Sequence, residues 1–97
     1  MRTIVLDCAR LADRGEAMDY LTGMLALPEW WGRNLDALYD CLTDVGEPVL
    51  LALQNRKAAA QTPFGRLLLR VLGDAAEENP RLRLAECGNG EEMSREI

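Results

Sequence analysis

The chain has 97 residues, of which 48% are hydrophobic and 28% charged, and its formal net charge is −5 at pH 7. This composition is typical of one globular domain and excludes a largely disordered chain. The negative charge disfavours binding to nucleic acid or to an anionic membrane, and it makes a basic protein the natural partner.

The sequence offers little of the usual chemistry of enzymes and metal sites. It contains no histidine, which is the commonest general base and metal ligand in proteins. No cysteine pair has the spacing of a zinc site, and no glycine motif for phosphate or dinucleotide binding occurs. We therefore expect a protein without enzymatic activity, metal or cofactor.

Cellular location can be predicted from the cysteines and from the start of the chain. Cys8, Cys41 and Cys87 are odd in number and widely spaced, which favours reduced thiols over a disulfide framework. The apolar run before Asp7 is too short for a signal-peptide core, and no run approaches the roughly 18 apolar residues of a membrane span. We expect a cytoplasmic protein that does not bind membranes.

Periodicity and capping residues predict one strand and two helices in the first half. The β-branched and apolar run before Asp7 is typical of a strand buried on both faces. Asp13 and Asn34 are N-cap residues, because their side chains can accept hydrogen bonds from free N–H groups of a first turn. Pro28 ends the first helix, and Gly32 is the flexible point of a connector. The expected elements are a strand over Thr3–Leu6, a helix from Asp13 to about Ala26, a connector over 28–33 and a helix from Leu35 to about Val45.

The second half predicts two further strands, again separated by helices. Thr62 followed by Pro63 is the pair expected where a helix begins. The expected elements are a strand over Val49–Leu53, a short helix within 54–61, a helix from Thr62 to just before Pro80, a strand over Arg81–Ala85 and a polar extension over 86–97. Strands separated by helices predict an α/β fold, a small three-stranded parallel sheet in the order βααβααβ, within a single domain over 1–97.

One stretch, Leu27–Pro48, concentrates charge and aromatic residues. It holds five acids against one base, Arg33, so its net charge is −4 of the −5 of the chain. On the predicted helix, apolar residues fall on one arc, and the opposite arc carries Asp36, Asp40, Thr43 and Asp44. Acids four residues apart repel each other by roughly 0.2–0.5 kcal/mol, so folding alone gives no reason for the acid at Asp40.

Three interpretations of this stretch are open. The arc can be an ordinary solvated face, with one of the adjacent Trp30 and Trp31 buried and the other exposed. Asp36 and Asp40 can be a catalytic carboxylate pair, although on one helix face they lack the cleft that would separate their pKa values. Aromatic residues beside unpaired acids favour the third interpretation, a surface that binds a basic protein.

A specific pattern lies at the centre of the stretch. It reads Leu27-Pro28, Trp30-Trp31-Gly32 and Asn34-Leu35-Asp36-Ala37-Leu38-Tyr39-Asp40. This pattern resembles the signature of the barstar family, whose namesake is the intracellular inhibitor of the secreted bacterial ribonuclease barnase, and the order of elements matches to about residue 85. The resemblance implies a barstar-like fold and a bacterial immunity protein or antitoxin. Such a protein would form a 1:1 complex with a basic ribonuclease and be monomeric when free.

The resemblance also implies roles for individual residues. Asp40 would stand in for a substrate phosphate by bonding cationic groups of the nuclease, and Asp36 would flank it; such charge-assisted hydrogen bonds are short and strong. The other expected partner-binding residues are Trp30, Trp31, Gly32, Asn34, Tyr39, Thr43, Asp44 and Asp74, the last a secondary acid on the final helix.

Four positions depart from the family pattern. Arg33 stands where barstar has an acid, Asp44 and Val45 stand where it has glycine and tryptophan, and Tyr39 replaces tryptophan. A positive charge that faces a cationic site is repulsive, so we expect Arg33 to select a different nuclease. The alternative function is an acidic module that binds a basic protein other than a nuclease, or another toxin.

Overall fold

The computed structural model describes residues 2–28 and 30–86, and within them the chain forms a three-stranded parallel sheet. The strands are β1 (Arg2–Asp7), β2 (Val49–Gln54) and β3 (Leu82–Glu86). They lie in the order β1-β2-β3, and the register places Leu51 opposite Ile4 on one side and Leu84 on the other. The predicted fold class and parallel sheet are confirmed.

The helices follow the predicted order, with one extra turn. They are α1 (Arg14–Met24), α2 (Leu35–Thr43), α3 (Arg56–Ala59) and α4 (Pro63–Glu78), and a short 3-10 helix, η1 (Cys8–Leu11), follows β1. None of the helices in the described part of the chain is long and apolar enough to cross a membrane.

Three predicted helix starts are confirmed by their caps. A side-chain oxygen of Asp13 accepts a hydrogen bond from the Glu16 N–H at 3.0 Å, and Thr62 caps α4 in the same way at 2.9 Å. Asn34 caps α2 through the Ala37 N–H at 2.7 Å. Each side chain satisfies a backbone donor that has no partner within its own helix.

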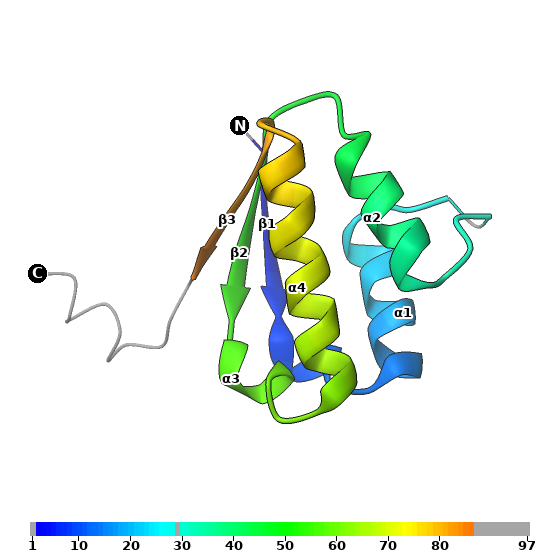
Figure 1. Cartoon of the computed structure of the whole chain (residues 1–97), viewed down its shortest axis with the longest axis vertical. Coiled ribbons are helices and arrows are strands. Elements are labelled where there is room, and N and C mark those ends of the chain that lie inside the picture. Colours follow the sequence, from blue (N-terminus) through cyan, green and yellow to red (C-terminus); the bar gives the residue numbers. More distant parts are fainter. Residues whose placement is uncertain (1, 29, 87–97) are drawn as a thin grey trace, which may run out of the picture.

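The molecule has two layers, and Figure 1 shows α1, α2 and α4 on the same side of the sheet. Alternate strand residues such as Leu6, Leu51 and Leu82 enter the core beneath these helices. The expectation that the first strand is buried on both faces was wrong, because β1 alternates and Val5 is 41% exposed on the uncovered face. Both crossover connections pass over the same face, so no helix within residues 2–28 and 30–86 covers the other.

Several boundaries differ from the prediction. The first helix ends at Met24 rather than Ala26, because the chain turns through a left-handed residue, Ala26, with φ 53°. α2 ends at Thr43 rather than Val45, and α3 is a single turn within the predicted range 54–61. Glu86 completes β3, while residues 87–97 of the predicted extension lie outside the described residues.

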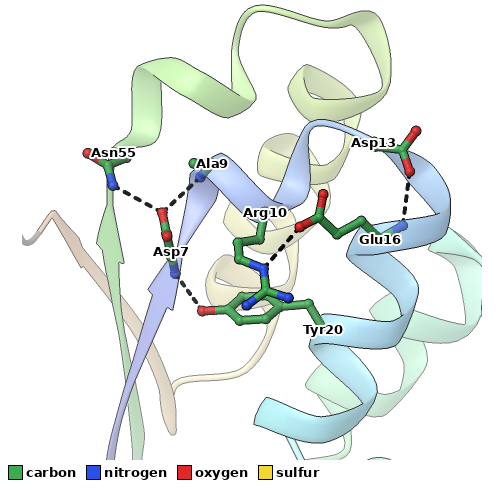
Figure 2. Close-up of polar contacts among 7 residues, drawn as sticks. All are labelled: Asp7, Ala9, Arg10, Asp13, Glu16, Tyr20 and Asn55. Atoms are coloured by element: carbon green, nitrogen blue, oxygen red, sulfur yellow. Dashed lines mark hydrogen bonds and ion pairs between the residues drawn. The ribbon is translucent and has the colours of Figure 1, made fainter.

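Polar contacts fix the carboxyl end of β1 to its neighbours, as Figure 2 shows. The Asp7 N–H donates to the Tyr20 hydroxyl at 2.8 Å, and the Asp7 carboxylate accepts from the Ala9 N–H and the Asn55 amide, each at 3.0 Å. Arg10 stacks over the Tyr20 ring, 4.7 Å from its centroid. These bonds hold α1 and the start of α3 against the end of the sheet.

Candidate functional site

The connector before α2 is held by the hydroxyl of Thr22 on α1. Thr22 Oγ1 donates to the Met18 carbonyl at 2.6 Å and accepts from Trp31 Nε1 at 2.9 Å and from the Arg33 guanidinium at 3.2 Å. A hydroxyl has one proton and two lone pairs, so this side chain is fully used. One atom on α1 therefore fixes two residues of the connector.

Arg33 points back at α1 instead of outward. Its guanidinium forms an ion pair with Asp19, and its φ of 52° lies in the left-handed region that non-glycine residues rarely adopt. The side chains of Arg33 and Asp19 are 44% and 78% exposed, so water screens the pair. Whether Arg33 presents its charge to a partner stays a prediction; in the structure this charge is paired with Asp19 of the same chain.

Gly32 and Asn34 shape the last part of the connector. Gly32 has φ 94°, and a Cβ at this position would lie 3.1 Å from the Ala37 Cβ. The Asn34 amide donates to the Gly32 carbonyl at 3.2 Å while its oxygen caps α2. Only glycine fits this backbone without strain, so Gly32 is required by the loop whether or not it contacts a partner.

The adjacent tryptophans separate as the simplest interpretation predicts. Trp30 is 84% exposed, whereas Trp31 is 3% exposed and belongs to the core. We expected Trp31 to be a partner contact, and this needs correction, because its ring packs inward and its N–H bonds to Thr22. Trp31 anchors the loop, and Trp30 is the one of the two tryptophans that lies at the surface.

The exposed face of α2 carries the predicted acids. Leu38 and Leu42 are buried, whereas Asp36, Asp40 and Asp44 are exposed. Two further predicted residues, Tyr39 and Thr43, are half-buried, and the Thr43 hydroxyl donates to backbone carbonyls of its own helix. The structure thus places Trp30 shortly before the start of α2. The acids of α2 lie along one face of that helix.

Asn79 supports α2 from the end of α4 and was missed in the sequence. Its buried side-chain amide donates to the carbonyls of Leu42 and Val45, each at 3.1 Å. Leu42 lies in the final turn of α2 and Val45 just after it, where backbone carbonyls lack partners within the helix. An asparagine directly before a proline at a helix end was a usable signal, although it does not reveal the distant partner.

Asp74 lies on a different helix from the other predicted acids. It is exposed on α4, the helix against which α2 packs, and it also borders a cleft formed with α3. The structure supplies the acid at the predicted place, and a partner that covers α2 would have to extend over α4 to reach it.

The electrostatic effect of the acids is seen at Cys41 on α2. Burial, and then the nearby carboxylates of Asp40 and Asp44, raise the pKa of the Cys41 thiol above its ordinary value. Among residues 2–28 and 30–86, neither Asp40 nor Asp44 forms an ion pair, so both carboxylates can attract a cationic partner. Among the described residues, no group of three or more histidines, cysteines or acids is placed to hold a metal ion.

Comparisons with known proteins agree with this geometry. The family model described as Barstar (barnase inhibitor) matches residues 1–89. The chain belongs to the barstar family. It is also 43% identical over 82 residues to a Bacillus subtilis (strain 168) protein named "Putative ribonuclease inhibitor YrdF", an alignment that covers 80% of this chain and 89% of that protein. Membership of the barstar family indicates an inhibitor protein and not an enzyme.

Proposed function

We propose that this protein binds and blocks the cationic active site of a barnase-like microbial ribonuclease. The observation that carries the proposal is the exposed Trp30 beside the acidic face of α2, on a loop already held in shape by Thr22 and Arg33. A loop that is ordered before binding loses less conformational entropy when the complex forms. The family match and the name of the Bacillus relative support the same function.

In the proposed complex, Asp40 takes the place of a substrate phosphate. Its carboxylate is exposed and forms no ion pair within residues 2–28 and 30–86, so it is available to arginine or histidine groups of the nuclease. Asp36 flanks it one turn earlier, and Trp30 and Tyr39 supply aromatic contact. A surface of this kind gives fast, salt-sensitive association and a small number of dominant contacts.

The proposal includes how the complex serves the cell. The protein would act as an antitoxin in the cytoplasm, where it occupies a secreted-type ribonuclease in a 1:1 complex before the enzyme leaves the cell. It would be monomeric when free. The internal pairing of Arg33 with Asp19 leaves the acids of α2 as the dominant charges toward the nuclease.

The test is inhibition of purified barnase-like ribonucleases by the purified protein. We expect stoichiometric loss of RNA cleavage for at least one of them and a 1:1 complex in calorimetry. An absence of binding across such a panel would contradict the proposal. Capture of a basic protein without nuclease activity would favour the alternative, an acidic module for a different partner.

A further inference from the structure

A second surface lies across α4 from α2. In Figure 1, α3 and β3 lie on one side of α4 and α2 lies on the other. Between α3, α4 and the ends of β2 and β3 is a cleft of about 1050 Å³. Its more buried lining includes Leu53, Leu69 and Gly73, which are apolar or small, and its exposed lining is rich in charge.

The cleft has more bases than acids, four against three, although the protein as a whole is acidic. Four of the chain's 11 bases line it: Arg56, Lys57, Arg66 and Arg70. Arg56 pairs with Glu86 at 3.1 Å, and the Arg66 guanidinium donates to the Ala60 carbonyl at 2.9 Å. Within the described part of the chain, Lys57 and Arg70 form no ion pair. Asp74 and Glu77 of the lining also form no ion pair among the described residues, so Lys57 and Arg70 can turn to a ligand only in competition with these two acids.

Two features of the cleft lining on α4 are unfavourable for the stability of that helix. Arg66 and Arg70 are four residues apart on α4, and like charges at this spacing destabilise a helix by roughly 0.2–0.5 kcal/mol. Gly73 lies inside the same helix, where glycine is less stable than alanine by roughly 0.5–1 kcal/mol. A Cβ at Gly73 would meet no atom within 4 Å, so tight packing does not require glycine there. Its effect is to widen the cleft.

The wall opposite α4 is fixed in place. Asn55, which lines the cleft, has a left-handed φ of 55°, and its amide donates to the Asp7 carboxylate, as Figure 2 shows. Ala9, another lining residue, bonds to the same carboxylate through its N–H. The start of α3, with Arg56 and Lys57, is thereby tied to the end of β1. The cleft is a formed site before any ligand enters.

We propose that this cleft binds a small organic phosphate of mononucleotide size. A phosphate monoester carries about −1.5 to −2 charge near neutral pH, and Lys57 and Arg70 are the cations that can bind it. Arginine recognises phosphate oxygens through two parallel N–H donors, and the apolar lining accommodates the organic part. Asp74, Glu77 and Glu86 also line the cleft, and with the net charge they disfavour a long polyanion such as RNA.

Calorimetric titration with the four ribonucleoside monophosphates tests the proposal. We expect saturable binding of at least one, weaker binding of inorganic phosphate and none of the matching nucleoside. Arg70→Ala and Lys57→Ala should each weaken binding about tenfold, because each removes a charge-assisted contact. Arg81→Ala, which removes an exposed arginine outside the cleft, should change it little. Failure of all four nucleotides, or equal affinity for nucleotide and nucleoside, would overturn the proposal.

A substitution that fills the cleft with a larger side chain tests the site without removing a charge. Gly73→Leu should block binding while it preserves or raises stability, since the helix gains propensity and the side chain enters open space. Gly23→Leu on α1 is the matched control, because a Cβ there also meets nothing within 4 Å. Undiminished nucleotide binding by folded Gly73→Leu would contradict the site, and tighter binding of an RNA oligonucleotide than of its monomers would contradict the ligand class.

Discussion

The indole N–H of Trp31 donates a 2.9 Å hydrogen bond to the hydroxyl of Thr22, and this bond joins the connector before α2 to α1. The same hydroxyl accepts from Arg33. The position of the exposed Trp30 therefore depends on a buried neighbour and on a helix that is not itself part of the proposed surface. Mutations at this support should change both folding and binding.

Replacement of Thr22 by valine keeps the shape of the side chain and removes the hydroxyl. Trp31 Nε1 then lacks its acceptor in a buried position, so we expect a loss of about 1–3 kcal/mol in the free energy of unfolding, measured in urea. Ribonuclease binding should weaken as well, because the loop is less ordered. Thr3→Val, at an exposed position of β1, is the control and should be close to neutral. Equal stability of the two variants would contradict the role of the hydroxyl.

The acids of α2 should differ in their contribution to binding. Asp40→Ala should weaken the ribonuclease complex by at least about 2 kcal/mol, roughly thirtyfold in Kd, as expected of a central contact. Asp44→Ala should change it by less than about 0.5 kcal/mol, because Asp44 is the C-cap of α2 at the edge of the surface. Calorimetry on the two variants decides the matter, and equal small effects would rule out a phosphate-mimicking role for Asp40.

Gly32 and Gly46 form a matched pair of glycines in loops. Gly32→Ala should destabilise the protein by roughly 1–3 kcal/mol, because it places a Cβ at φ 94° and close to Ala37. Gly46→Ala should be neutral or stabilising by up to about 1 kcal/mol, since no atom lies within 4 Å of the added Cβ. Thermal unfolding of both variants tests this order of stability, and the reverse order would contradict it.

The Asp19–Arg33 pair should affect association more than stability. Asp19→Ala should change the free energy of unfolding by less than about 1 kcal/mol, because both side chains are well exposed. It leaves Arg33 without its acid and should slow association with a cationic ribonuclease at low salt. The double variant Asp19→Ala/Arg33→Ala should restore the rate in stopped-flow measurements. A rate that is unchanged in Asp19→Ala would show that Arg33 does not act through its charge.

The Cys8 thiol should make the free energy of unfolding fall as pH rises into the alkaline range. Burial, and next the charge of Asp7, raise the pKa of the Cys8 thiol from 9.0 to about 11. The Cys8 thiol loses its proton at a higher pH in the folded state than in the unfolded state. Its contribution to the free energy of unfolding is therefore fully present below pH 9 and declines as pH rises toward 11. Urea unfolding at several alkaline pH values should show a steeper decline for the native protein than for Cys8→Ala. Identical declines would exclude this coupling.

Much of the fold could be predicted from local features of the sequence. The caps at Asp13, Asn34 and Thr62 are local chemistry, and short apolar runs separated by helices predict parallel strands. The exposure of Val5 on β1 could not be predicted in this way, because an apolar run does not show how many faces of a sheet are covered.

In the candidate site too, features set by local sequence could be predicted, and those set by contacts with distant residues could not. Residues that project from a regular helix, such as Asp36 and Asp40, were placed correctly on the exposed face. Trp31 was not, because its orientation depends on Thr22 of another helix, and the pairing of Arg33 with Asp19 of that helix was not predicted either. Asn79 was missed because its bonds to α2 span more than 30 residues of sequence.

Those bonds from Asn79 have a consequence for protein synthesis. The carbonyls of Leu42 and Val45 receive their side-chain donor from a residue near the end of α4. During translation, α2 leaves the ribosome well before Asn79 does, so a nascent chain cannot yet hold α2 as it is held in the finished protein. The end of α2 is therefore secured only late in the synthesis of each molecule. A chain released before residue 79 would carry every acid of α2 without the bonds that secure the end of that helix.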